Sequence, residues 1–456
     1  MGSGEAVLAA ILAMSAIVLV ARWPVGVSLG TYAFLLPFDA VLIVGQVGQI
    51  HLHLTWFVGA MAGAVLLTLG LVGRGFVRPP RVALWLSLFV FFAGMSSIWA
   101  INAHNAVFRL PVIGLLLFLY LAAVSIRTNE NELATVAWLA ILGGCVAGAL
   151  SLYAFLHVEG GALIQELSGR ETLATGERVT DPNTLGATLI LPLSLAVGLL
   201  LSSHTWVRRT FLGGVVALIG IGICATMSRG ALVATAVVFA IYLRQSRARQ
   251  HVLVCIAILG AVLLVMPQAF FLRLDGAFTD RGAGRLDIWH VGLQAFLHHA
   301  VIGAGLDCFP DAYNEYVHTA PNFKGFSRAP HNIYLATLVE LGAAGLVLLL
   351  STIRGHLILT GKLREAESDN SSRLRSISYE SACWGLLASG VFLDILWEQY
   401  FWFTLMLLVM AASVRRPGRE ASSRGQAPFF TMRATGEGIL SDWQVPRCRT
   451  LPDHPH

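Results

Sequence analysis

The sequence predicts an all-α membrane protein, a polytopic transmembrane bundle of about twelve helices. Two observations support this class. Hydrophobic residues make up 56% of the 456-residue chain and charged residues only 12%, which is about half the charged fraction of an ordinary soluble domain. Apolar stretches near the length of a hydrocarbon core also recur along nearly the whole chain. They leave no room for a soluble domain of normal size.

The apolar runs justify the spans in chain order. The first run, near residues 5–21, has no basic region before it and no A-x-A site before Arg22, so we expect a retained helix rather than a signal peptide. The second, residues 25–47, contains prolines, which argue against a simple span. Further spans are expected near residues 53–73, 82–100, 106–126, 133–157, 183–202, 207–226, 230–243, 250–271, 332–358, 378–394 and 397–414.

The short loops predict the orientation, because Lys and Arg prefer the cytoplasmic side. Basic residues gather in alternate loops, at 74–81, 127, 208–209, 244–249, 354–364 and 415–416. The intervening loops are then external, and they include 158–182, the turn around Arg229 and the long stretch 272–330. The side of the amino terminus stays open, since Arg22 favours an external position against the usual internal preference.

Composition also argues against several functional classes. The formal net charge is +5 and the arginines are scattered, so no nucleic-acid partner is expected. The six cysteines form no CxxC pair, which indicates neither a metal site nor a disulfide framework. Residues 1–414 are interpreted as one membrane domain. Residues 415–456 are polar and rich in Pro, Gly and Arg, and are predicted to form a disordered cytoplasmic tail.

The external stretch 272–330 is long enough to be functional. Within it, "GRLDIWHVGLQAFLHH" predicts an amphipathic helix that begins with Arg285 and Asp287. Its apolar face would consist of Leu286, Trp289, Leu293, Phe296 and Leu297. Such a helix would either lie at the membrane surface or pack on the bundle. The glycine-rich turn "GAGLDCF" follows and lets the chain reverse.

Two residues stand out as candidates for chemistry. Arg229 lies in a tight turn between apolar runs, and an arginine at membrane depth usually faces a cavity or a partner unless it reaches the interface. His331 follows Pro330 at the start of a predicted helix. Its usual pKa of about 6.5 suits a general base, and helix amino termini favour anions. The alternative for His331 is an interfacial residue without a catalytic role.

Other polar residues lie in the same external segments. Arg178 is a candidate anion ligand, while Asp181 is predicted to cap the helix that starts at Pro182. Arg328 is a candidate contact for lipid phosphate and Asn332 is expected to start its helix. The candidate substrate-binding residues are therefore Arg178, Arg328, Asn332 and Asp287.

Near the end of the membrane domain, "LDILWEQYFW" places Asp394 and Glu398 beside aromatic residues on an external turn. Their default interpretation is anchoring in the aromatic belt at the membrane surface.

These segments together resemble the O-antigen ligase and polymerase superfamily of integral membrane glycosyltransferases. The resemblance covers about residues 50–414 and rests on four stretches, which are "DPNTLGATLILPL", "MSRGALVA", "GRLDIWHVGLQAFLHHAVIGAGLDCF" and "PHNIYLATLVELGAAGL". By this resemblance the family's essential arginines fall on Arg229 and Arg285, and its essential histidine falls on His331. One departure is Ala300, which stands where the family pattern has a proline, and it removes no chemical group.

The resemblance implies transfer of a glycan from undecaprenyl diphosphate to an acceptor hydroxyl, without metal or other cofactor, at the periplasmic face of a bacterial cytoplasmic membrane. The arginines would bind the diphosphate and His331 would act as general base. A lipid A core sugar is the acceptor in a ligase, whereas a polysaccharide polymerase extends another repeat unit, and both remain open. A transporter or flippase is the alternative from a different class, although no internal repeat is visible.

Overall fold

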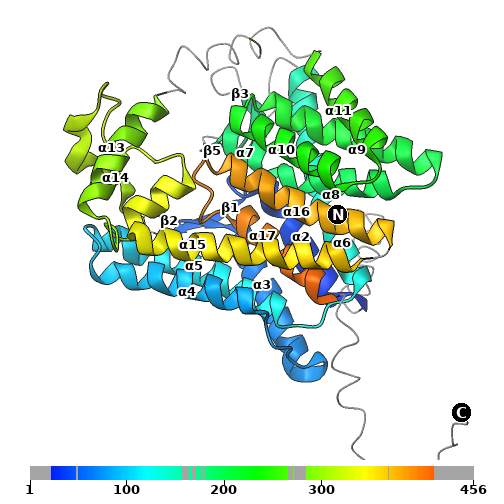
Figure 1. Cartoon of the computed structure of the whole chain (residues 1–456), viewed down its shortest axis with the longest axis horizontal. Helices are drawn as coiled ribbons and strands as arrows, with labels where there is room; N and C mark the ends of the chain where they lie inside the picture. Colours follow the sequence, from blue (N-terminus) through cyan, green and yellow to red (C-terminus); the bar gives the residue numbers. More distant parts are fainter. Residues whose placement is uncertain are drawn as a thin grey trace, which may run out of the picture. The chain divides into compact units, whose positions relative to one another are not determined.

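The computed structural model describes residues 22–47, 50–156, 164–166, 171–175, 178–179, 181–264, 271, 284–367 and 369–414. The predicted first span and the predicted tail lie outside these residues. The all-α class is confirmed (Figure 1). Before residue 284 the main helices are α2 (Pro24–Leu35), α3 (Leu54–Leu69), α4 (Arg81–Met95), α5 (Ala103–Val124), α6 (Glu130–Leu156), α7 (Pro182–Thr188), α8 (Ile190–Ser202), α9 (Trp206–Ala225), α10 (Arg229–Gln245) and α11 (Arg249–Leu264).

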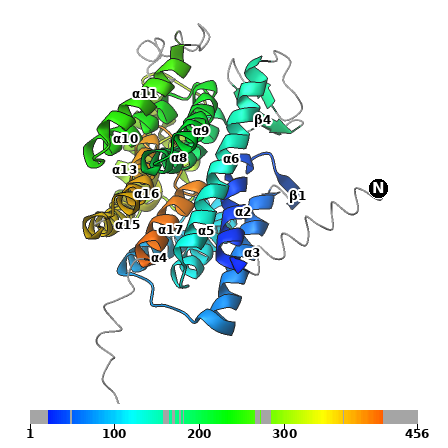
Figure 2. The same cartoon turned by 90° about the vertical axis from the view of Figure 1, so that its right-hand side faces the viewer.

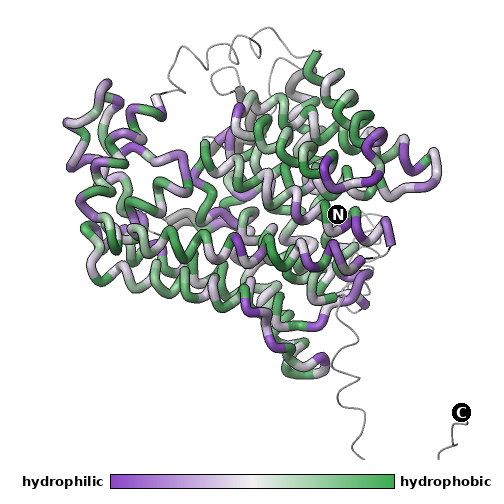
Figure 3. The backbone as a smooth tube through the Cα atoms, viewed as in Figure 1, coloured by the Kyte–Doolittle hydropathy of each residue, from purple (hydrophilic) through white to green (hydrophobic). Residues whose placement is uncertain are grey.

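The second half of the chain is organised around long helices. They are α13 (Arg285–His298), α14 (Phe309–Tyr316), α15 (Ile333–Ala366), α16 (Asn370–Ser389) and α17 (Gln399–Val414). Short helical turns are η1 (Leu36–Phe38), η2 (Gly70–Arg74), η3 (Ser96–Ile98) and η4 (Val317–Thr319). In the described part of the chain, seven helical segments are long and apolar enough to cross a membrane, and hydrophobic residues predominate along them (Figure 3).

The strands are short and lie between helices. The antiparallel pair β1 (Ile43–Val47) and β2 (Ile50–His53) follows α2, and β3 (Ile164–Glu166), β4 (Glu171–Thr175) and β5 (Arg178–Val179) precede α7. The predicted run 25–47 is therefore not a span. Its helix ends at Leu35, and Pro37 lies in the 3₁₀ turn that follows, where its missing N–H group is tolerated.

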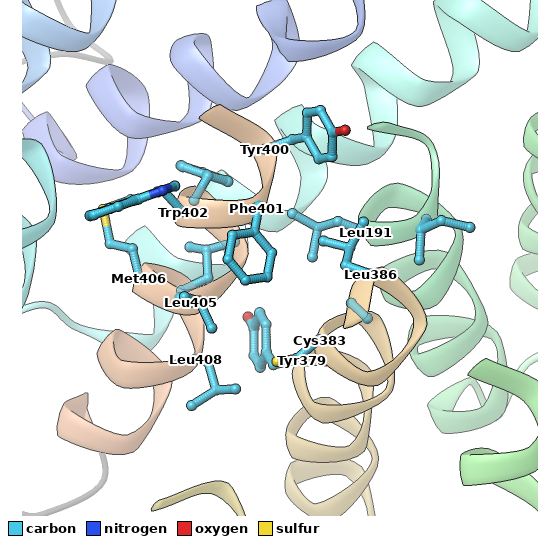
Figure 4. Close-up of a cluster of buried hydrophobic side chains, with 14 of the residues drawn as sticks. Leu191, Tyr379, Cys383, Leu386, Tyr400, Phe401, Trp402, Leu405, Met406 and Leu408 are labelled. Carbon is cyan, nitrogen blue, oxygen red and sulfur yellow. The ribbon is translucent and has the colours of Figure 1, made fainter. Parts of the chain in front are cut away.

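The core is built around α17. Its side chains from Gln399 to Ala412 are buried on all sides (Figure 4), as expected for a helix that is apolar all round. It packs against α5, α15 and α16, while α16 also packs against α8 and α10. Around these, α2 lies against α6 (Figure 2) and α4 lies along α15.

Helix α15 is broken at Gly342, which has φ +66°. The turn at 300–305 pairs with the broken backbone. The N–H groups of Ala304 and Gly305 donate to the carbonyls of Val339 and Glu340 at 2.8 Å each, and the Ala343 N–H donates to the Ala300 carbonyl at 2.8 Å. The glycine-rich turn thus satisfies the backbone groups that the break exposes.

The predicted amphipathic helix exists as α13, and it packs on the bundle through Ile288, Val291 and Ala295. The predicted apolar face is only partly used in this packing. Leu286, Leu293 and Leu297 are about half exposed or more, at 56%, 48% and 61%. The packing interpretation is confirmed for one face, which contacts α14 and α15. A position at the membrane surface stays a prediction for the exposed leucines.

Candidate functional site

The candidate site lies where the amino termini of α7, α10 and α15 come together. Gly186 of α7 is so close to α10 that an added Cβ atom would lie 2.8 Å from the Cβ atom of Ala231. At the start of α10, an added Cβ atom at Gly230 would lie 3.4 Å from Phe392. At the start of α15, the Ile333 N–H donates to the Gly390 carbonyl at 2.9 Å. Segments far apart in sequence therefore meet around residues 390–392.

Side chains cap each of these helices. The Asp181 carboxylate accepts from the N–H groups of Asn183 and Thr184 at 2.6 and 3.3 Å, as predicted for the start of α7. The Ser228 hydroxyl accepts from the Ala231 N–H at 3.3 Å. The Asn332 amide oxygen accepts from Tyr334 and Leu335 at 2.9 and 3.0 Å, which confirms that Asn332 starts its helix. Free N–H groups at such termini favour an anion.

The backbone is unusual next to the candidate residues. Four described residues other than glycine have positive φ values, and beside Asp307 they are Met227, Ser327 and His331, at +47°, +52° and +46°. Met227 lies two residues before Arg229, and Ser327 precedes Arg328. Such conformations are disfavoured for side chains other than glycine and cluster at functional sites. Here they set the direction in which the chain enters α10 and α15.

His331 is half-buried between groups of opposite charge. Burial lowers its pKa below the ordinary 6.5, and the positive charges of Arg285 and Arg328 lower the pKa further, while the Asp181 carboxylate opposes them. The imidazole is therefore neutral at pH 7 and able to accept a proton. A buried base with a lowered pKa beside cationic groups is a typical arrangement for a functional site.

Arg229 and Arg285 occupy the first positions of α10 and α13, and both are half-buried. Arg285 follows Gly284, whose φ of +79° supports the turn into the helix. Helix α13 is tied to the His331 segment because the indole N–H of Trp289 donates to the Pro330 carbonyl at 3.0 Å. The structure therefore brings Arg285 and His331 together, as their charge coupling also indicates.

The remaining candidates lie in different environments. Arg328 is exposed, and its guanidinium donates to the Lys324 carbonyl. Asp287 is buried, where its carboxylate accepts from the Asn322 amide at 3.1 Å and lies 3.5 Å from the Lys324 ammonium. Arg178 begins the short strand β5, but its side chain lies outside the described residues.

The segment with Asp394 and Glu398 differs from its predicted place in the aromatic belt. Trp397, Tyr400 and Trp402 are buried in the bundle, at 7%, 4% and 3% exposure. Burial raises the pKa of Asp394. Burial, together with the charge of Asp39, also raises the pKa of Glu398 to about 7. Both residues are half-buried, and Glu398 lines a cavity inside the bundle.

A cavity of about 210 Å³ opens beside these residues. We call it the acidic pocket, and its principal polar residues are Asp39, His53, Asp181, Glu398, Gln399 and Tyr400. Asp39, His53, Gln399 and Tyr400 are not among the site residues predicted from the sequence. Their available signal was weak, consisting only of isolated polar residues next to apolar runs.

Residues 214–350 match the model of a family described as O-antigen ligase. The matched segment runs from α9 into α15 and contains Arg229, Arg285 and His331. No curated protein matches the chain. The match and the apolar helices together support a multi-pass membrane protein that resembles the O-antigen ligase superfamily of membrane glycosyltransferases over residues 214–350.

Proposed function

We propose that the protein transfers a glycan from undecaprenyl diphosphate to an acceptor hydroxyl, with a lipid A core sugar as the acceptor, at the periplasmic face of the cytoplasmic membrane. The observation that carries this proposal is the half-buried His331 tied to the start of α13, where Arg285 lies, at the place where capped helix termini meet. The lowered pKa of His331 supports its role as a base. The alternating basic loops support the external position of these residues.

The proposed donor site uses Arg229 and Arg285. A diphosphate leaving group gains negative charge as the bond between its oxygen and the sugar C1 atom breaks. Guanidinium groups stabilise that charge through paired hydrogen bonds and keep their protons at all relevant pH values. Arg328, Asn332, Asp287 and Arg178 remain proposed contacts of the substrates. Of these, Asn332 and Asp287 also hold the local backbone and loop in place.

His331 is the proposed general base. The acceptor O–H gives its proton to the imidazole while its oxygen bonds to C1, and the C1–O bond to the diphosphate breaks. Undecaprenyl diphosphate leaves. A single displacement of this kind inverts the configuration at C1. A positioned base typically contributes about 10² to 10⁴ in rate.

The test of this mechanism is the His331→Asn variant, because asparagine tolerates the positive φ of this position. We expect kcat to fall by about 10² to 10⁴ while the donor KM changes little. The measurement is glycan transfer by the purified full-length protein from undecaprenyl diphosphate glycan. His290→Asn, an exposed histidine on α13, is the matched control. Full transfer by His331→Asn would remove His331 from the role of base.

A polysaccharide polymerase of the same superfamily is the second candidate. The matched segment contains the proposed Arg229, Arg285 and His331, and these residues would serve a ligase and a polymerase equally. A transporter or flippase is the candidate from a different class. Substrate transport in liposomes that survives the double variant Arg285→Ala/His331→Ala would favour transport over catalysis.

A further inference from the structure

The acidic pocket is large enough for a ligand. Its volume of about 210 Å³ is more than ten times the roughly 10–15 Å³ that one water molecule needs. Its walls come from the segment after α2, from β2, from α7 and from the start of α17. These segments are joined by packing in the finished fold, so the cavity has a defined shape.

Hydrogen bonds hold several of its polar groups in fixed positions. The Gln399 amide nitrogen donates to the Asp39 carboxylate at 3.1 Å and to the Thr55 hydroxyl at 2.9 Å. The Tyr32 hydroxyl donates to the Gln399 amide oxygen at 2.8 Å. His53 lies 3.3 Å from the second oxygen of Asp39. A network of this kind fixes the orientation of Asp39 and Gln399 before any ligand arrives.

Tyr400 shows that the pocket has an unused hydrogen-bonding group. Its side chain is only 4% exposed, and its hydroxyl has no hydrogen-bond partner. Figure 4 shows this hydroxyl pointing away from the neighbouring apolar side chains. A buried hydroxyl without a partner is costly, by about 1–3 kcal/mol. Since Tyr400 lines the cavity, a ligand in the pocket is a natural partner.

The composition of the pocket indicates the chemistry of that ligand. The charged and polar groups are three carboxyl groups, an imidazole, an amide and hydroxyls, and no lysine or arginine lines it among the described residues. Such a surface repels a diphosphate and offers many acceptors to hydroxyl groups. The described residues contain no cluster of three His, Cys, Asp or Glu side chains that could hold a metal ion. A neutral, polyhydroxylated sugar fits this pattern.

Asp181 connects the pocket to His331. It lines the cavity, and its charge acts on His331 in the direction opposite to Arg285 and Arg328. His331 therefore has both cationic residues, from α13 and the 328 loop, and the acidic cap of α7 among its charged neighbours. The anionic diphosphate of the donor is expected to bind near the cationic residues. The acceptor must present a hydroxyl to the base, and we expect it to bind near the acidic groups.

We propose that the acidic pocket binds the sugar of the acceptor and directs its nucleophilic hydroxyl to His331, with Glu398 and Tyr400 as hydrogen-bonding residues. This proposal rests on the proposed function, and it adds the acceptor site to it.

The test uses Glu398→Gln and Tyr400→Phe, each of which changes a single functional group. Purified full-length protein would be assayed with undecaprenyl diphosphate glycan as donor and, as acceptor, the core glycolipid extracted from a strain that lacks this gene. We expect the acceptor KM to rise about 10-fold, because each variant loses a hydrogen bond to the sugar. The donor KM should stay within about twofold. Tyr242→Phe is the matched control, because its hydroxyl is bonded to Ser194 and Ser378 inside the bundle.

The outcomes separate the pocket from the function. The acceptor pocket would be overturned by an unchanged acceptor KM in both variants, or by a raised donor KM with an unchanged acceptor KM. Glycan transfer by the wild type would still support the proposed function. If the wild type transfers no glycan, the proposed function fails. Calorimetric titration with the oligosaccharide released from the same glycolipid then decides the pocket independently. Binding that is lost in Tyr400→Phe supports it, and equal binding to both proteins overturns it.

Discussion

At the scale of the residue, the charges around His331 determine its proton affinity. Burial has the largest effect and lowers the pKa of His331, and the charges of Arg285 and Arg328 lower it as well. The charge of Asp181 raises it. Because the base must be neutral to accept a proton, activity should be lost as the pH falls through a pKa below 6.5.

Two variants should move this loss in opposite directions. Arg328→Gln removes a positive charge, which raises the pKa of His331 and shifts the acid limb of kcat to higher pH. Asp181→Asn removes a negative charge, which lowers that pKa and shifts the limb to lower pH, while asparagine still caps α7. The check is a pH profile of kcat at saturating donor and acceptor. Shifts in the same direction would contradict the assignment of the limb to His331.

The guanidinium of Arg285 is expected to act through its shape as well as its charge. Arg285→Lys keeps the charge but loses paired hydrogen bonding to a diphosphate. We expect kcat/KM for the donor to fall about 10- to 100-fold, which corresponds to one lost charge-assisted hydrogen bond. Initial rates over a range of donor concentrations provide the measurement. Arg354→Lys, an exposed position on α15, should leave the rates unchanged, and equal effects in both variants would argue against a specific contact.

At the scale of the element, the break in α15 should be highly sensitive to substitution. A Cβ atom at Gly342 would lie 2.3 Å from the Val301 carbonyl oxygen, and the positive φ strains any other residue. Gly342→Ala should therefore destabilise the protein by about 1–3 kcal/mol or more. Gly361→Ala on the same helix meets nothing within 4 Å and should be neutral or slightly stabilising. Thermal unfolding in detergent compares the two, and similar midpoints would contradict the role given to the break.

The elements also show where sequence patterns succeed. Helix caps depend on neighbouring residues alone, so they can be predicted from the sequence. The predicted caps at Asp181 and Asn332 are confirmed. The prolines in the run 25–47 argued against a simple span, and the helix does end at Leu35, but hydropathy did not reveal the turn and strands that follow it. The apolar face of α13 was predicted from spacing, but tertiary packing uses it only in part, through Trp289 and Phe296, and centres on Ile288, Val291 and Ala295.

At the scale of the whole molecule, the acceptor class is the main prediction. In a strain that lacks the gene, loss of ligation should leave the lipid A core without the glycan, because the lipid-linked donor has no route to it. Acceptors that carry one repeat unit would instead indicate a polymerase. Mass spectrometry of the surface glycolipids distinguishes these results, and re-expression of the wild-type gene is the control.

The sequence by itself determined the all-α membrane class, the order of the helices and the positions of Arg229, Arg285 and His331, because hydropathy and local motifs are properties of neighbouring residues. The tertiary structure alone decided which distant residues share a site. Asp39 and Gln399 are 360 positions apart and share a hydrogen bond, and Asp181 lines the same pocket while its charge raises the pKa of His331. No local pattern encodes such a meeting, since it depends on how α2, α7, α15 and α17 pack around one another.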